Sequence, residues 1–488
     1  MTDRQPVLST YRSSADRRSA CPGLFRLAPA LDGAICRVKL AAGRLSAAQA
    51  KAVAAAAQKV SAAPIELTNR ANFQIRAIQA ADEAPLIDAL ITAGLGPLPP
   101  EGVAENCVID DAAMLGSDDV RNVMVSPLAG RDPQQIADVL PLADRLLETL
   151  QREPRFHALS PKFAIQIDGG ESVAMLRHPH DLWLSVSAAD QVMIGLAGCM
   201  PVAGDTDTPA GDRALASAPL SAAHDLICAA LDLFLEIAAG LPGVTRVKQL
   251  PAEIAGRAFI DRLQQRLQIA LRRDDAVATW RRQAVSRNAH LGLIAERDAG
   301  QVSIGAMPPL GRITAVQLMA VADLAAKSGD GSLRLTPWQS LVLPAVAAAK
   351  APAVLRQLTD LGLATDPAAS FARMIACTGS AGCGSGLAAT QADGGRLAGL
   401  LQARHQAFPV HLSGCSKSCA AIRAEPATLV AVSPGHYDLY RRQAGAASRF
   451  GQRLAEHITI DEAAGLLADL AESEAKTRCL ADREAETQ

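Results

Sequence analysis

An internal repeat constrains the fold of this chain more than any other feature of its sequence. The segment from Gly43 to Thr68 aligns without gaps with the segment from Gly311 to Thr336, and eleven of the twenty-six positions are identical. Four of the matches are alanine, which is abundant here, but the Gly-Arg at the start and the Leu-Thr at the end of both copies also coincide. We therefore expect a duplicated unit.

Each copy of the repeat predicts a strand, a helix and a second strand. Ser46 and Thr314 stand where a helix N-cap is expected, and the second strand ends in Leu-Thr. A longer segment of alternating strand and helix signals follows each copy. The expected fold class is therefore α+β, with two pseudo-symmetric halves.

Two cysteine pairs in the second half carry the strongest chemical signal. Their spacing is Cys377-x5-Cys383 and Cys415-x3-Cys419, on the stretches ACTGSAGCGSG and VHLSGCSKSCA. Thiolates hold iron–sulfur clusters, and small residues let the backbone wrap closely around the cube. We expect a cluster here, and only here, because the first half has no paired cysteines. The alternatives are a structural zinc site, which favours shorter gaps in both pairs, and four unconnected buried cysteines.

The remaining sequence favours a protein of the reducing cytoplasm. The other six cysteines are scattered singly and suggest no disulfide framework. The N-terminal segment is polar, and the most apolar helix candidate, 226–241, is interrupted by Asp232 and Glu236, so we expect no membrane association. A net charge of -2 gives no bias toward nucleic acid.

Taken with several motifs, this order of segments resembles the sulfite and nitrite reductase family. The motifs are DGAICRVKL, LTNRANFQIRAI, SDDVRNVMVSPLAG and SPKFAIQI, together with the four cysteines. The resemblance covers nearly the whole chain. It implies two duplicated halves, each with a ferredoxin-like piece and a larger α/β segment, which enclose a tetrapyrrole beside a 4Fe-4S cluster bound by the two cysteine pairs.

The resemblance also implies a tetrapyrrole-binding set of basic and polar residues on these motifs. The set comprises Arg37, Thr68, Arg70, Asn72, Gln74, Arg76, Arg121 and Lys162. Residues 70, 72, 74 and 76 alternate along a strand-like stretch, so their side chains would share one face. Such a face could bind the carboxylates of a tetrapyrrole or could simply be a solvated sheet surface.

One departure from the reductases narrows the expected reaction. Those enzymes typically carry a second lysine two residues after the first, whereas Lys162 is followed by Phe163 and Ala164. The opening ACPGLFRLAPALDGAICRVKL and the GCSKSCA motif resemble instead a branch of the family that acts on a tetrapyrrole in aerobic cobalamin biosynthesis. That resemblance implies a monooxygenase-type oxidoreductase for which precorrin-3A and dioxygen are the substrates. The branch usually has His-Pro where this chain has Ala421 and Ile422, so no role of that histidine is transferred.

The chemistry implied by this branch needs further components. A mononuclear non-haem iron is expected in addition to the cluster, and His178, His180 and Asp181 offer a suitable ligand set, unless they simply pack in a hairpin turn. No flavin or nicotinamide domain is evident, because the loose Gly-x-Gly pattern at Gly384 follows a cluster cysteine directly. A separate reductase or ferredoxin is therefore expected as electron donor.

Two other functions stay open at this point. One is a sirohaem-dependent sulfite or nitrite reductase, and the other is a non-catalytic iron–sulfur protein that binds a tetrapyrrole. The expected organisation is an N-terminal tail at 1–20, ferredoxin-like half-domains at 21–98 and 288–368, a cluster-free α+β domain at 99–255, a helical linker at 256–287, a cluster-binding domain at 369–470 and a charged tail at 471–488.

Overall fold

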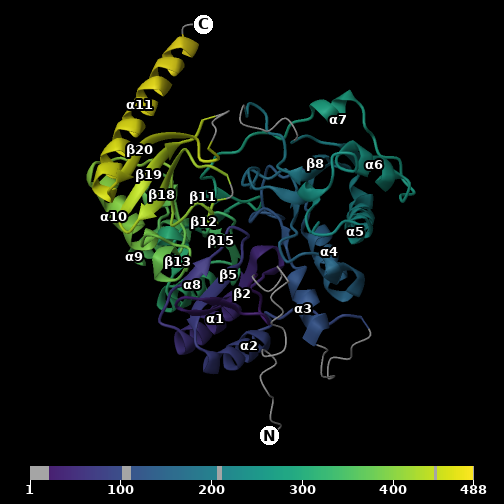
Figure 1. Ribbon diagram of the computed structural model, residues 1–488, viewed down its shortest axis with the longest axis horizontal. Helices are drawn as coiled ribbons and strands as arrows, with labels where there is room; N and C mark the ends of the chain where they lie inside the picture. The colour runs from purple at the N-terminus through teal and green to yellow at the C-terminus, as the bar shows by residue number, and fades with distance from the viewer. Residues whose placement is uncertain (1–20, 102–110, 206–211, 422, 444–447, 487–488) are drawn as a thin grey trace.

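The duplication predicted from the repeat is visible in four five-stranded sheets, which come in two matched pairs (Figure 1). The computed structural model describes residues 21–101, 111–205, 212–421, 423–443 and 448–486. The expected tail 1–20 and Ile422 lie outside these residues. None of the helices described is long and apolar enough to cross a membrane.

The first pair of sheets is built by an exchange of strands between the two repeats. One sheet has the order β1 (Ala28–Ala30), β2 (Gly33–Val38), β5 (Phe73–Ile78), β4 (Ile65–Leu67) and β13 (Arg312–Ile313). The other has the order β11 (Gly292–Ala295), β12 (Gln301–Ala306), β15 (Leu341–Ala347), β14 (Ser332–Leu335) and β3 (Arg44–Ser46). Because β13 joins the first sheet and β3 the second, the two ferredoxin-like pieces cannot separate without breaking both sheets.

The helices of the repeat begin where the sequence predicts. Helix α1 (Ala47–Val60) is capped by Ser46, and α8 (Ala315–Ser328) is capped by Thr314, each with a reciprocal glutamine three residues later. These two helices, with α2 (Glu83–Thr92) and α9 (Ala351–Asp360), bury one continuous apolar core that draws residues from both repeats. The shared core and the strand exchange make the two pieces one structural unit.

The second pair of sheets has one topology used twice. The first comprises β6 (Val123–Met124), β7 (Ile165–Asp168), β8 (His180–Ala188), β9 (Gln191–Gly198) and β10 (Ala216–Pro219). The second comprises β16 (Met374–Ala376), β17 (Val410–Ser413), β18 (Ala427–Ser433), β19 (His436–Arg441) and β20 (Gln452–Ile458). In both sheets the first three strands run parallel to one another, and the fourth and fifth strands each run antiparallel to the strand before them. The predicted α+β fold with two pseudo-symmetric halves is thus confirmed.

Helices cover these two sheets, and two of the helices do not follow the domain boundaries expected from the sequence. The first domain carries α3 (Asp111–Asp119), α4 (Leu140–Arg152) and α5 (Ala223–Ala239), and the second carries α10 (Thr390–Ala403) and α11 (Ile460–Glu486). The expected linker 256–287 contains α6 (Arg257–Gln264) and α7 (Asp275–Thr279), but α6 buries its apolar face in the core of the first domain. Helix α11 runs without a break across the expected boundary at 470 and projects from the body of the molecule (Figure 1).

Candidate functional site

The four cysteines of the two pairs gather at one edge of the second α/β domain. Cys377 directly follows β16, and Cys415 lies shortly after β17, its parallel neighbour. The carboxyl ends of neighbouring parallel strands meet at the same sheet edge. Both cysteine loops therefore start from adjacent points, and the backbone amide of Gly414 donates to the Cys377 Sγ at 3.1 Å.

Glycines let the two loops pack against each other. A Cβ on Gly414 would meet the Cα atoms of Gly379 and Gly386 at 3.2 and 3.3 Å and the Cys377 Sγ at 3.4 Å. A Cβ on Gly386 would lie only 2.5 Å from the Gly379 backbone. Gly379 also has a positive φ of 68°, which favours glycine. The loops thus form a cradle closed by backbone atoms, as a cluster site requires.

The four thiols differ in exposure but lie within range of one another's charges. Cys383 and Cys419 are exposed, while Cys377 and Cys415 are half-buried. Burial raises the pKa of Cys419, and so does the charge of each of the other three cysteines, which places all four within electrostatic range. No group of three or more ligand side chains in the described part of the chain is arranged to hold one ion. Thiolates are the protein ligands of iron–sulfur clusters, so these four cysteines are the candidate ligands.

Arg76 joins the first ferredoxin-like sheet to the cysteine loop. Its guanidinium donates to the carbonyl oxygen of Gly382 at 2.9 Å and forms an ion pair with Asp32 at 3.0 Å. The backbone amide of Leu31 donates to the same carbonyl at 3.4 Å. Arg76 is buried and its charge is matched by Asp32 and, at 3.8 Å, by Glu66. It therefore positions the loop next to Cys383 rather than presenting a free cation to a ligand.

Three of the predicted basic residues retain binding capacity. Arg37 donates to Gln74 at 3.1 Å, but its buried Nε has no hydrogen-bond partner among the residues that the structure describes. Arg70 donates to the backbone carbonyl of Lys162 at 3.1 Å, and burial, followed by the charges of Arg246 and Arg37, lowers the pKa of Arg70 to about 10. The Lys162 side chain is exposed. The structure thus places Arg37 and Arg70 within electrostatic range of each other, and Arg70 against the backbone of Lys162.

The polar residues predicted beside them have internal roles. The Thr68 hydroxyl accepts from the backbone amides of Arg70 and Asn72 at 3.4 and 3.2 Å. The Asn72 side chain is buried and accepts from the backbone amide of Leu40 at 2.8 Å. Gln74 lies between Arg37 and Glu66, to which it also donates. These contacts fix the strand and the turn that carry Arg37 and Arg70.

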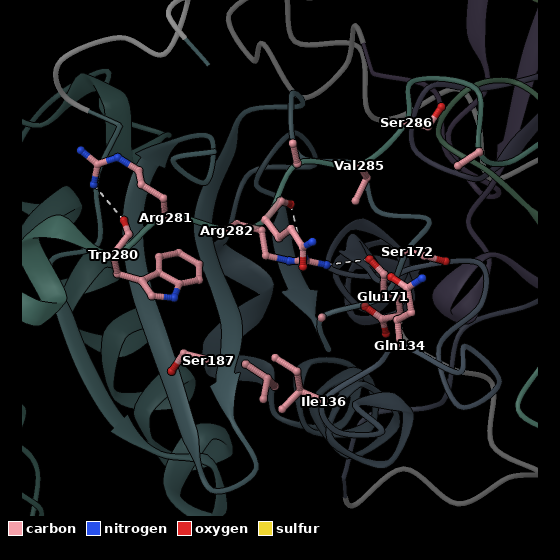
Figure 2. Close-up of a pocket in the computed structure, with 15 residues that line it drawn as sticks. Gln134, Ile136, Glu171, Ser172, Ser187, Trp280, Arg281, Arg282, Val285 and Ser286 are labelled. Carbon is pink, nitrogen blue, oxygen red and sulfur yellow. Dashed lines mark hydrogen bonds between the residues drawn. The ribbon is translucent and has the colours of Figure 1, made fainter. Parts of the chain in front are cut away.

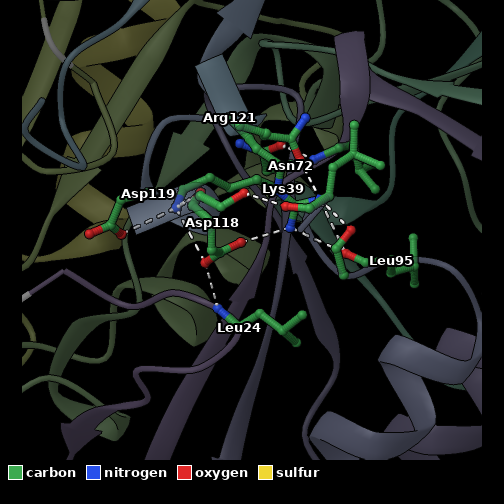
Figure 3. A network of polar contacts seen from close by, with 12 residues as sticks. Leu24, Lys39, Asn72, Leu95, Asp118, Asp119 and Arg121 are labelled. Carbon is green, nitrogen blue, oxygen red and sulfur yellow. Dashed lines mark hydrogen bonds and ion pairs between the residues drawn. The ribbon is translucent and has the colours of Figure 1, made fainter. Parts of the chain in front are cut away.

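Arg121 belongs to a buried ionic network (Figure 3). It pairs with Asp118 at 2.7 Å and donates to the carbonyl oxygens of Leu95 and Gly96 at 3.2 Å. Lys39, 3% exposed, lies 3.5 Å from Asp118 and 3.6 Å from Asp119. Arg121 thus has its charge matched inside the protein. We revise its expected role from substrate contact to positioning. The sequence places Asp118 three residues before Arg121, but it does not show that the two side chains are buried together.

The iron ligand set expected at residues 178–181 does not form. His178 and His180 pack with ring centroids 4.9 Å apart, and their nitrogens lack well-aligned partners. Asp181, however, is committed to Arg246 at 2.7 Å and to the backbone amides of Ala164 and Val247. Burial, then the charge of Arg70, lowers the pKa of His178 to about 3. We derive no step through a mononuclear iron at these residues.

Sequence reasoning missed two arginines near this cluster of histidines. The charges of Arg246 and Arg423 both contribute to the low pKa of His178, after burial and Arg70. Arg423 follows Cys419 closely in sequence and pairs with Asp212 at 2.8 Å, so it links the cysteine loop to the first α/β domain. Neither residue follows a strand signal, and the only hint was the basic stretch TRVK around Arg246.

The first α/β domain has no thiols at the positions that match the four cysteines. Ser126 and Asp132 follow Val123 of β6 by the same intervals at which Cys377 and Cys383 follow Met374 of β16. By the same count along β7 and β17, Gly170 and Ala174 match Cys415 and Cys419. Asp132 accepts from the Ser172 hydroxyl at 2.6 Å. Two polar and two small residues thus stand where the other domain has its four cysteines.

A cavity of about 480 Å³ lies beside this cysteine-free counterpart (Figure 2). Its wall includes Trp280, Arg282 and Glu171. Arg282 pairs with Asp168 at 2.9 Å and donates to the backbone carbonyl of Glu171 at 2.6 Å. Glu171 is fully buried, and one of its carboxyl oxygens has no hydrogen-bond partner. A neutral carboxyl group explains this arrangement.

Replacing Glu171 with glutamine is expected to change the pH dependence of stability. Burial, and then the charge of Asp168, raises the pKa of Glu171 to about 8. Because the folded state holds this proton more tightly than the unfolded state, the wild type loses stability as pH rises toward that value. E171Q should therefore gain relative stability, on the order of 3 kcal/mol, between about pH 5 and pH 8. Urea unfolding across this range measures the difference; exposed Glu148→Gln is the control, and parallel curves would contradict the assignment.

Comparison with known proteins identifies the architecture. The family model of the nitrite/sulfite reductase ferredoxin-like half domain matches residues 29–93 and 294–361. The model of the nitrite and sulphite reductase 4Fe-4S domain matches residues 116–271, which is the copy without the two cysteine pairs. The structure of the Mycobacterium tuberculosis NirA protein superposes with a TM-score of 0.69 at 22% identity, over 88% of this chain and 79% of that chain.

Curated relatives include two kinds of enzyme. A chloroplastic ferredoxin–nitrite reductase of Zea mays is 28% identical over 73% of this chain and 62% of its own length. A precorrin-3B synthase of Sinorhizobium sp is 27% identical over 86% of this chain and 82% of its own length. The chain thus spans less than two thirds of the plant reductase but most of the synthase.

Proposed function

Because the chain is built from the domains of the nitrite and sulfite reductase family, we propose that it is an oxidoreductase with the activity of a precorrin-3B synthase. The reaction would be the dioxygen-dependent hydroxylation of precorrin-3A with closure of a ring acetate to a lactone, in aerobic cobalamin biosynthesis. One oxygen atom would enter the substrate and the other would leave as water, so two electrons would come from an external reductase or ferredoxin.

The observation that supports this choice is the nature of the two residues that follow Lys162. The reductase pattern places a second lysine at position 164, where this chain has alanine. Ala164 is 2% exposed, its backbone amide donates to Asp181 at 3.0 Å, and Phe163 before it is buried in the core. This segment therefore offers one cation to a ligand, whereas reduction of a small oxyanion calls for several. The coverage of the synthase relative supports the same choice.

In this proposal the four cysteines hold a 4Fe-4S cluster, which supplies one-electron transfer when bound. Arg37, Arg70 and Lys162 bind the acetate and propionate arms of the tetrapyrrole. Thr68, Asn72 and Gln74 hold the strand and turn that present them. Arg76 fixes the loop next to Cys383, so the distance between the cluster and the tetrapyrrole would stay constant during turnover.

The proposal is tested with protein purified without oxygen. We expect a broad visible absorption without sharp porphyrinoid bands, and consumption of dioxygen on addition of precorrin-3A and a reductant. The ferredoxin–nitrite reductase relatives favour a second candidate, a sirohaem-dependent nitrite or sulfite reductase. That candidate predicts haem bands and nitrite or sulfite turnover. Binding of precorrin-3A without consumption of dioxygen would favour a non-catalytic tetrapyrrole-binding protein.

Replacing Arg70 with alanine is expected to weaken tetrapyrrole binding. The loss of one charge-assisted contact costs about 1.5 to 3 kcal/mol, or roughly 10- to 100-fold in affinity. Fluorescence titration with a uroporphyrinoid carboxylate measures the change, and cluster absorption should stay at the wild-type level. Arg273→Ala, which removes an exposed arginine paired with Asp261, is the matched control. Equal affinities of R70A and the control would exclude Arg70 from the site.

A further inference from the structure

At the two strand exchanges, equivalent positions of the repeat hold residues of opposite charge, Glu66 in one and Arg334 in the other. Where β13 joins β4, Arg312 lies directly across from Glu66. Where β3 joins β14, Arg44 lies directly across from Arg334. Glu66 and Arg334 occupy the same position of the internal repeat, as do Arg312 and Arg44. One exchange thus pairs opposite charges, and the other sets two cations face to face, which is unfavourable without further partners.

The charges at the first exchange are satisfied within the protein. Glu66 accepts from Arg312 at 3.0 Å and from the Thr378 hydroxyl at 3.2 Å, and Arg76 lies at 3.8 Å. At the second exchange, Arg44 pairs with Asp144 through a bond of 3.0 Å. These pairs account for every charged group named here except Arg334.

Arg334 is a buried cation that forms no ion pair with a carboxylate of the described residues, although the charges of Asp330 and Asp144 lie within electrostatic range. Its side chain is 6% exposed, and its Nε and Nη1 have no hydrogen-bond partner within the described structure. Burial, then the charges of Arg44 and Arg131, lowers its pKa to about 10. Burying a charged group without a partner costs several kcal/mol, so such groups are usually paired. A missing partner is the simplest account of this environment.

Arg334 lines a separate cavity of about 280 Å³ between β14 and the start of α4. Arg131 also lines it, but Glu296 at 3.1 Å and Asp330 at 2.5 Å already match that charge. Leu140, the first residue of α4, borders the cavity, so the positive end of a 13-residue helix faces it. Asp138 and Asp298 stand at its exposed rim. Glu296, which is paired with Arg131, and the exposed Arg297 complete the charged lining. The unmatched charge inside is that of Arg334, which favours an anion, while the carboxylates at the rim disfavour a multiply charged one.

We propose that this cavity binds a small oxyanion of single charge, of the carboxylate class, whose oxygens accept hydrogen bonds from the guanidinium of Arg334. The planar fork of arginine matches a carboxylate in both geometry and charge. The volume suits a small carboxylate and is too small for a tetrapyrrole. This site is independent of the proposed function, because it lies on the other ferredoxin-like sheet from Arg37 and Arg70.

The test uses the full-length protein and acetate as the probe. Thermal unfolding is followed in sodium acetate and in sodium chloride of the same ionic strength, at pH 7, for wild type, Arg334→Met and Arg334→Lys. We expect acetate to raise the wild-type midpoint by several degrees over chloride and to leave R334M unchanged. The apparent affinity of R334M for acetate should be at least about tenfold lower. R334K keeps the positive charge but lacks the planar guanidinium. Acetate should therefore raise its midpoint by an amount between those of the wild type and R334M.

Two results would overturn the proposal. One is an equal acetate effect in the wild type and R334M, which would place the binding elsewhere. The other is no acetate effect in the wild type, which would mean that solvent alone satisfies Arg334. If R334M fails to fold, R334K carries the same comparison, since an acetate response equal to that of the wild type would exclude fork-specific recognition.

Discussion

Replacing Cys415 with alanine is expected to abolish the iron–sulfur cluster. The residue lies at the centre of the cradle, where Gly414, its neighbour, already donates to the Cys377 Sγ. Removing one of four thiolates leaves an iron without its protein ligand, and the loops offer only Ser and Thr hydroxyls in its place. Visible absorption and acid-labile sulfide of protein purified without oxygen should fall to background.

Cys228→Ala is the matched control for this experiment. Cys228 is buried, whereas Cys415 is half-buried, and it lies on α5 in the core of the first α/β domain, away from the cradle. It should keep the full cluster content with a modest loss of stability. Retention of the cluster in C415A, or its loss in C228A, would show that the ligands have been assigned wrongly. Tetrapyrrole binding can be measured on the same samples, which separates failure of the cluster from failure of the site.

The strand exchange marks the limit of what the repeat could predict about the fold. Its capping residues, Ser46 and Thr314, act locally, and the two helices begin where they predict. The preceding strands are only two or three residues long, and their partners lie in the other repeat. A pattern of alternating residues cannot tell which sheet such a short strand joins. The duplication was therefore predictable, whereas the exchange was not.

The site shows the same division between local and distant information. The cysteine spacing and the glycines around it act over one loop, so the cradle could be predicted from the sequence. Arg76 instead depends on Asp32, and Arg121 on the carbonyl oxygens of Leu95 and Gly96, all of which other segments contribute. An arginine on a strand has the same sequence signature whether its charge is free or matched. Only the folded structure shows that Arg37 keeps an unpaired nitrogen, while Arg76 and Arg121 serve the scaffold.

Replacing Asp118 with asparagine is expected to cause a large loss of stability. Asp118 is 1% exposed, pairs with Arg121 and Lys39, and accepts from the backbone amide of Leu24 at 3.0 Å. Losing this carboxylate leaves two buried cations. Lys39 keeps an anionic partner in Asp119, whereas Arg121 keeps only the carbonyl oxygens of Leu95 and Gly96 among the described residues. Removing one member of a buried ionic network costs about 3 to 5 kcal/mol. Urea unfolding at pH 7 measures the loss, and exposed Asp261→Asn should cost far less.

The pH dependence of the free energy of unfolding below pH 4 provides an independent check on the same carboxylate. Burial alone would raise the pKa of Asp118, but the charges of Lys39 and Arg121 outweigh it and lower the pKa to about 2. Since the folded value lies below the unfolded one, the stabilisation is present above about pH 4 and is lost as the pH falls toward 2, a change of about 2 kcal/mol. D118N should lack this component. If D118N and wild type lose stability in parallel below pH 4, the carboxylate is not ionised in the folded network, and the role assigned to Lys39 and Arg121 fails with it.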